Sequence, residues 1–239
     1  IKPEAMSKYM KYFEEKCKGS KAMIEQAKKV IPGGVQHNLA FNYPFPLVVE
    51  KAEGAYLYDI DGNRYVDYLQ AGGPTLLGSN YEPVNRKVWE VVKESGPVTG
   101  LFHPYEMKLA EKIRECMPWV EMYRCLASGT EADMVAIRIA RTYTGKQNII
   151  KVGGAYHGWS DQLVYSLHIP YTQTFEAHGI PKEASANTKE FFPGDVAGLR
   201  KVLEENEKNG GTAAVIIEPF GPESGTRPVA MDFAAKVRE

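Results

Sequence analysis

The stretch that decides the fold is DVAGLRKVLEENEKNGGTAAVIIEPF, residues 195–220. Its first half places apolar residues at helical spacing and stops at Gly210-Gly211, which predicts a helix. Its second half is a continuous apolar run, which is typical of a strand that is covered on both faces. A helix followed directly by such a strand indicates an α/β layered domain with a mainly parallel sheet.

Helices and strands also alternate upstream of this stretch. The helical patterns lie at residues 82–95, 104–116 and 131–144. The strand-like runs are YRCLA (123–127) and NIIKVGG (148–154). Residues 170–193 have weak periodicity, so we expect a long surface excursion there. The alternation supports the α/β assignment for most of the chain.

The first part of the chain has a different texture. Residues 4–30 predict two helices divided at Gly19, with Ser20 as the N-cap of the second. Residues 47–69 alternate apolar and polar side chains around a short turn, which is the pattern of an antiparallel meander. We therefore expect an N-terminal helical arm and a meander.

These patterns divide the chain into two predicted domains. Residues 1–72 hold the helical arm and the meander, and residues 73–239 hold the α/β layers. The final stretch, MDFAAKVRE, begins a helix without a C-terminal cap or a following strand. We therefore expect the large domain to be incomplete, with the chain an amino-terminal piece of a longer polypeptide.

The composition favours a small-molecule partner. The 29 basic and 30 acidic residues nearly cancel, so nothing indicates nucleic acid or an anionic membrane as a partner. The three cysteines lack the spacing of a zinc site or a disulfide framework, and we expect neither a metal nor an oxidising compartment. No apolar run reaches the 18 residues of a membrane span. These features together predict a cytoplasmic protein.

The first candidate site is the small-residue break before the helix at 131–144. The first amides of that helix lack helical partners, and with the helix dipole they attract an anion. Gly129 would let a phosphate approach the backbone, while Ser128 and Thr130 add hydroxyl donors. The same residues also suit an ordinary N-cap with Glu131 in the first turn.

Two further candidates follow strand-like runs, where α/β sheets place their ligands. Tyr156 and His157 lie between glycines, so their rings could lie against a planar ligand; a buried tyrosine and a satisfied core histidine is the alternative. Glu218 follows the apolar run at 212–217 and could orient a hydroxyl or an amine, or merely end the strand in water.

Five segments in this order and spacing resemble the class III aminotransferases, in particular the glutamate-1-semialdehyde aminomutase-like group. They are IPGG (31–34), GAYLYDIDGNRYVDY (54–68), SGTEA (128–132), GGAYHG (153–158) and IIEPFGPESG (216–225). The resemblance implies the aspartate-aminotransferase fold (fold type I), with a three-layer α/β/α large domain. It also implies pyridoxal 5'-phosphate (PLP) as cofactor and a homodimer with active sites at the subunit interface.

The resemblance also assigns roles to the candidate residues. Ser128, Gly129 and Thr130 match the residues that hold the cofactor phosphate. Tyr156 matches the aromatic residue that stacks on the pyridine ring, and His157 its neighbour in the cofactor pocket. Glu218 matches a glutamate near the ring hydroxyl. The complete protein is then expected to move an amino group from a small-molecule donor to a keto acid or aldehyde.

The chain departs from the family pattern at its catalytic residues. The lysine that forms the Schiff base and the aspartate that pairs with the pyridinium nitrogen are expected beyond Glu239. Lys151 precedes the Tyr-His pair, so it is not assigned the Schiff-base role, and we expect its side chain to be solvated at the surface. A non-catalytic binding module that lacks the lysine is the alternative.

A second departure concerns the substrate. Aminomutase and β-amino-acid transaminase relatives carry an arginine soon after the Pro-Gly-Gly that grips a substrate carboxylate, whereas VQHNLAFNYPF (35–45) has none. His37 could substitute in part, or be a loop histidine without a ligand. Glu223 matches a glutamate of several ω-transaminases and favours intermolecular transamination. An aminomutase or racemase reaction on the same cofactor stays open.

Overall fold

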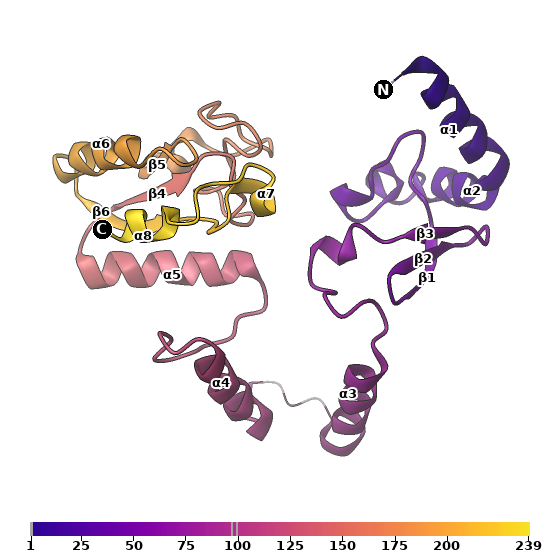
Figure 1. Cartoon of the computed structure of the whole chain (residues 1–239), viewed down its shortest axis with the longest axis horizontal. Helices are drawn as coiled ribbons and strands as arrows, with labels where there is room; N and C mark the ends of the chain where they lie inside the picture. The colour runs from indigo at the N-terminus through magenta and orange to yellow at the C-terminus, as the bar shows by residue number, and fades with distance from the viewer. Residues whose placement is uncertain (1, 97, 99) are drawn as a thin grey trace. The chain divides into compact units, whose positions relative to one another are not determined.

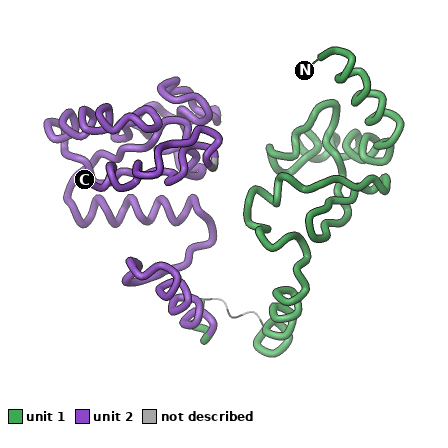
Figure 2. The backbone as a smooth tube through the Cα atoms, viewed as in Figure 1, with its two compact units in different colours: residues 1–104 green, residues 105–239 purple. Residues whose placement is uncertain are grey.

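We describe a computed structural model of the chain, in which residues 2–96, 98 and 100–239 are described (Figure 1). The backbone forms two compact units, Ile1–Pro104 and Tyr105–Glu239 (Figure 2). The compact units divide at residue 104, whereas the domain boundary at residue 72 stays a prediction.

The first unit contains the predicted helical arm and meander. Its helices and strands are α1 (Pro3–Lys16), α2 (Lys18–Ala27), β1 (Val49–Glu53), β2 (Tyr56–Asp59), β3 (Arg64–Val66) and α3 (Glu82–Ser95), with short 3-10 turns at Pro32–Gly34, Asn38–Ala40 and Gln70–Gly72. The strands pair antiparallel in the order β1-β2-β3, as the alternation predicted.

The break between α1 and α2 lies at Cys17, so the predicted break at Gly19 is wrong. Ser20 is not the N-cap, because it lies inside α2 and its hydroxyl accepts the Val48 N–H instead. The first-turn amides of Gly19 and Ser20 donate to the carboxylate of Asp61, over 2.6 and 2.8 Å. A carboxylate from the meander therefore caps this helix.

The second unit is an α/β layered domain. It comprises α4 (Pro104–Cys116, whose first residue belongs to the first unit), α5 (Gly129–Thr144), β4 (Asn148–Val152), a 3-10 turn at Lys182–Ser185, β5 (Thr188–Phe191), α6 (Val196–Glu207), β6 (Thr212–Ile216), α7 (Pro222–Gly225) and α8 (Phe233–Arg238). The three strands run parallel in the order β5-β4-β6. The fold class predicted from residues 195–220 is confirmed.

Helices cover both faces of this sheet (Figure 1). On one face, Ile150 and Phe191 pack with Leu199 of α6 and Phe233 of α8. On the other face, Ile149 packs with Ile137 of α5 and with Leu163. The middle strand β4 is buried at every position, so cover on both sides explains its apolar residues Ile149, Ile150 and Val152.

Two strand expectations in this unit are wrong. YRCLA forms no strand, because a strand needs a hydrogen-bonded neighbour and none of the described strands pairs with it. Thr188–Phe191 forms the edge strand β5, although it lies inside the predicted surface excursion. Its buried positions include Thr188 and Glu190, so it lacks the apolar signal of a buried strand.

Candidate functional site

The N-terminal end of α5 is accessible to solvent. Ser128 is its N-cap: the Ser128 hydroxyl accepts the Glu131 N–H over 3.2 Å and donates to the Glu131 carboxylate over 2.9 Å. The structure thus contains the ordinary cap that the sequence left open. The N–H groups of Gly129 and Thr130 have no acceptor among the described residues, so they remain able to bind an anion.

The loop after β4 lies against this helix end. The backbone N–H of Trp159 donates to the hydroxyl of Thr130 over 3.1 Å. Gly158 has a φ of +83°, and a Cβ there would lie 2.4 Å from the Thr130 hydroxyl oxygen. The glycine is therefore needed both for its backbone conformation and for the close approach of the two segments.

The segment after β6 meets the same loop. The carboxylate of Glu218 accepts the backbone N–H of Tyr156 over 3.0 Å. Strand β6 ends at Ile216, two residues before Glu218, so Glu218 does not close the strand as the sequence suggested. The structure therefore brings together the three stretches that hold Thr130, Tyr156 and Glu218.

Tyr156 and His157 differ in burial. Tyr156 is half exposed, so its ring is accessible. His157 is buried, and its Nε2 has no hydrogen-bond partner in the described part of the chain. Burial, with a smaller contribution from the charge of Lys151, lowers the pKa of His157 to about 4. The imidazole is therefore neutral at physiological pH, with one ring nitrogen unsatisfied.

Lys151 is not at the surface, so that expectation is wrong. It occupies the fourth position of β4 and is fully buried. Its ammonium donates to the carbonyl oxygens of Leu163 and Tyr165 over 3.1 and 2.7 Å. A buried amine is tolerated here because these carbonyls replace water. The signal available from the sequence was its place in the middle of an apolar strand.

The two predicted substrate residues have local partners. Glu223, in α7, contacts Nδ1 of His168, a histidine that the sequence reasoning did not single out. His37 lies in the first unit, where its Nδ1 accepts the Leu39 N–H over 3.1 Å. Substrate binding by Glu223 and His37 stays a prediction.

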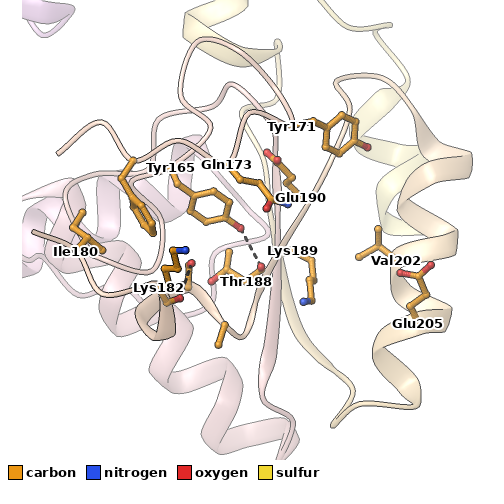
Figure 3. Close-up of a pocket in the computed structure, with 13 residues that line it drawn as sticks. Tyr165, Tyr171, Gln173, Ile180, Lys182, Thr188, Lys189, Glu190, Val202 and Glu205 are labelled. Carbon is orange, nitrogen blue, oxygen red and sulfur yellow. Dashed lines mark hydrogen bonds between the residues drawn. The ribbon is translucent and has the colours of Figure 1, made fainter. Parts of the chain in front are cut away.

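A pocket of about 690 Å³ lies along β5 (Figure 3). Its lining includes Tyr165, Tyr171, Glu190 and Val202, and none of the predicted cofactor residues. The start of α5 is open to solvent instead, so the candidate site and this pocket are separate features of the second unit.

Two classes of feature are absent from the described ranges. No helix there is long and apolar enough to cross a bilayer. No group of three or more His, Cys, Asp or Glu side chains there is arranged to hold a metal ion.

Comparison with known proteins identifies the family. Residues 39–239 match the family "Aminotransferase class-III". The chain belongs to this family. Class-III aminotransferases are PLP-dependent enzymes. This cofactor agrees with the accessible start of α5 and with the loop after β4 that holds Tyr156.

Individual relatives place the chain within the class-III aminotransferases. The glutamate-1-semialdehyde 2,1-aminomutase of Methanothrix thermoacetophila is 38% identical over 202 residues, covering 84% of this chain and 46% of that protein. An ω-transaminase from Sphaerobacter thermophilus superposes with a TM-score of 0.85 at 28% identity, covering 95% of this chain and 53% of that one.

A transaminase with PLP bound superposes with a TM-score of 0.82 at 27% identity, covering 93% of this chain and 52% of that one. The fold is thus that of the fold type I PLP enzymes. This class-III aminotransferase chain spans about half the length of the proteins it matches.

Proposed function

We propose that the protein carrying this chain is a PLP-dependent enzyme that moves an amino group from a small-molecule donor to a keto acid or aldehyde. The family supports the cofactor and the general reaction. The observation that carries the proposal is the convergence of three distant segments through two hydrogen bonds, Trp159 N–H to Thr130 and Tyr156 N–H to Glu218.

The start of α5 fits the phosphate end of the cofactor. The N–H groups of Gly129 and Thr130 would bind phosphate oxygens, favoured by the helix dipole. A Cβ at Gly129 would meet no atom within 4 Å, so there is room above this residue for a ligand. The Ser128 hydroxyl would have to turn from Glu131 to donate to the same anion.

The loop after β4 fits the ring of the cofactor. The exposed ring of Tyr156 offers an aromatic face, and the neutral imidazole of His157 offers a hydrogen bond. Glu218 would accept a hydrogen bond from the ring hydroxyl while it holds the N–H of Tyr156. PLP, when bound, withdraws electrons from the substrate carbon and so makes its proton removable.

Lys151 receives no covalent role in this proposal, because its amine is buried and donates to two carbonyl oxygens. The lysine that moves the substrate proton stays a prediction beyond Glu239. The homodimer and the cytoplasmic location likewise stay predictions that rest on the family resemblance and the composition.

Substitution of Gly129 tests the phosphate site. Gly129→Asp places a carboxylate at the first turn of α5, where the side chain has room and the helix dipole favours it. The fold should therefore persist. Because the new carboxylate repels the phosphate, PLP binding should weaken about tenfold or more. Quenching of tryptophan fluorescence measures this binding.

The matched control is Thr142→Asp, which adds the same charge at an exposed position near the other end of α5. It should leave PLP affinity within about twofold of wild type. Equal affinity of Gly129→Asp and wild type would show that the phosphate binds elsewhere.

An internal amino transfer is the second candidate, because the relative from Methanothrix thermoacetophila is a glutamate-1-semialdehyde 2,1-aminomutase. The match of Glu223 to a glutamate of several ω-transaminases favours transfer between molecules. Product analysis with and without a keto-acid acceptor separates the two. Turnover that needs the acceptor supports transamination, and turnover without it supports the aminomutase.

A further inference from the structure

The buried ammonium of Lys151 lies at a junction of the second unit. Lys151 belongs to β4, the middle strand of the sheet. Its Nζ donates to the carbonyl oxygens of Leu163 and Tyr165 and lies 5.1 Å from the centre of the Tyr165 ring. Because the whole side chain is inaccessible to water, these contacts replace its hydration.

Carboxylates from both sides of β4 act on this ammonium. Glu190 belongs to the neighbouring strand β5, and Glu218 follows β6, the strand on the other side. Burial lowers the pKa of Lys151 to about 8, and these two carboxylates oppose that shift. Lys151 is thus the positive centre between two acidic groups, one of which holds the N–H of Tyr156.

The carbonyls that Lys151 binds belong to a segment that supports the candidate site. This segment, residues 163–166, continues to Ser166, whose carbonyl oxygen accepts the N–H of Gly154 over 2.8 Å. The hydroxyl of Tyr165 donates to the carbonyl oxygen of Thr188 over 3.0 Å, as Figure 3 shows. Residues 163–166 therefore fix the turn that leads from β4 to Tyr156.

The carboxylate of Glu190, on β5, belongs to the same hydrogen-bond network. The Ser166 hydroxyl donates to Glu190 over 3.0 Å and accepts the N–H of Gln173 over 2.6 Å. Removing the Lys151 charge would leave this buried carboxylate without its counter-charge, although its hydrogen bond to Ser166 would remain.

We infer that Lys151 is a positioning residue for the Tyr156–His157 loop: its ammonium fixes residues 163–166 against β4 and supplies the positive charge beside Glu218 and His157. The inference rests on the proposed function, because only that function gives the Tyr156–His157 loop its role in binding the cofactor. The charge itself has a consequence that needs no cofactor, because a neighbouring cation disfavours protonation of His157.

The titratable groups that act on Lys151 and His157 come from several segments packed around β4. Glu190 lies on β5, Glu218 follows β6, and Tyr165 lies in the segment bound by the ammonium. The pKa of Glu190 is raised by its burial, and Lys151 opposes this rise. Loss of the Lys151 charge should therefore favour the neutral form of Glu190 and the protonated form of His157.

The test follows the His157 ring by NMR during a pH titration of the protein without cofactor. The resonance is assigned by its absence from the spectrum of His157→Asn. In wild type we expect a midpoint near 4, and in Lys151→Met a midpoint moved toward the ordinary histidine value of 6.5. Lys151→Arg keeps the charge and should restore a low midpoint.

Lys189→Met is the matched control, because it removes an exposed lysine from the neighbouring strand. It should leave the His157 midpoint unchanged. An unchanged midpoint in Lys151→Met would overturn the inference, as would an equal shift in Lys189→Met.

A readout in wild type covers the case in which Lys151→Met does not fold. Deprotonation of Lys151 near pH 8 should shift the His157 ring signal a second time. A flat His157 signal between pH 7 and pH 9, about one unit to either side of this midpoint, would overturn the inference without any Lys151 variant.

Cofactor binding separates this inference from the proposed function. If both hold, Lys151→Met weakens PLP binding, Lys151→Arg recovers part of it and Lys189→Met leaves it unchanged. Failure of wild type to bind PLP, with a shifted His157 midpoint in Lys151→Met, refutes the proposed function and keeps the charge effect. Normal PLP binding with an unshifted midpoint refutes the role of Lys151 alone.

Discussion

The close approach of Gly158 to α5 leads to a prediction with a matched control. In Gly158→Ala the new Cβ would lie 2.4 Å from the hydroxyl oxygen and 2.8 Å from the Cα of Thr130, at a φ of +83°. Gly179 has almost the same conformation, with a φ of +85°, but a Cβ there would meet no atom within 4 Å. The two glycines therefore separate backbone strain from steric overlap.

The expected magnitudes follow from these two terms. A left-handed backbone costs a non-glycine residue about 1–2 kcal/mol, so Gly179→Ala should lower the free energy of unfolding by that amount. Overlap in a close-packed contact adds about 1–3 kcal/mol. Gly158→Ala should therefore cost about 2–5 kcal/mol, and it should also break the hydrogen bond from Trp159 to Thr130.

The assay is urea unfolding followed by circular dichroism, with linear extrapolation to water. PLP affinity is measured on the same samples, and it should fall for Gly158→Ala only. Equal destabilisation by the two alanines would refute the close approach of the loop to α5. Normal PLP affinity in Gly158→Ala would separate this contact from the cofactor site.

Two further predictions concern stability. The unfolded chain protonates His157 near pH 6.5 and the folded chain only near pH 4, so the unfolded state holds more protons between these values. The free energy of unfolding should therefore fall by about 3 kcal/mol more in wild type than in His157→Gln as the pH drops across this window, and parallel pH profiles would contradict it. Asp61→Ala removes the acceptor of two first-turn amides of α2, and urea unfolding should show a loss of about 1–2 kcal/mol. No loss would mean that this carboxylate does not cap the helix.

The elements with strong local patterns were predictable from the sequence. The periodic helix and the apolar strand of residues 195–220 correspond to α6 and β6, and the alternation at 47–69 corresponds to the meander. These elements bury the faces that their patterns mark, so local sequence carries the information. The family motifs added the candidate cofactor residues, which local patterns left with structural alternatives.

The features that the sequence missed depend on partners far along the chain. Lys151 is buried because the carbonyl oxygens of residues 163 and 165 accept its hydrogen bonds. Strand β5 lacks the apolar pattern of a buried strand because it contains Glu190. This glutamate is buried, and its carboxylate accepts a hydrogen bond from the Ser166 hydroxyl. The cap from Asp61 reaches across 42 residues to Gly19. None of these contacts has a local periodicity, so a window of sequence could not show the partners, although the place of Lys151 in an apolar strand was a local sign of its burial.

The hydrogen bonds that assemble the candidate site join residues 29 and 62 positions apart along the chain. These residues come together only in the folded chain. A ligand of this site therefore binds the folded state and not the unfolded state. Its binding free energy would then oppose global unfolding, by about 2.7 kcal/mol at a ligand concentration one hundred times the dissociation constant. The supply of PLP would in this way set the free energy of unfolding of the protein as well as its chemistry.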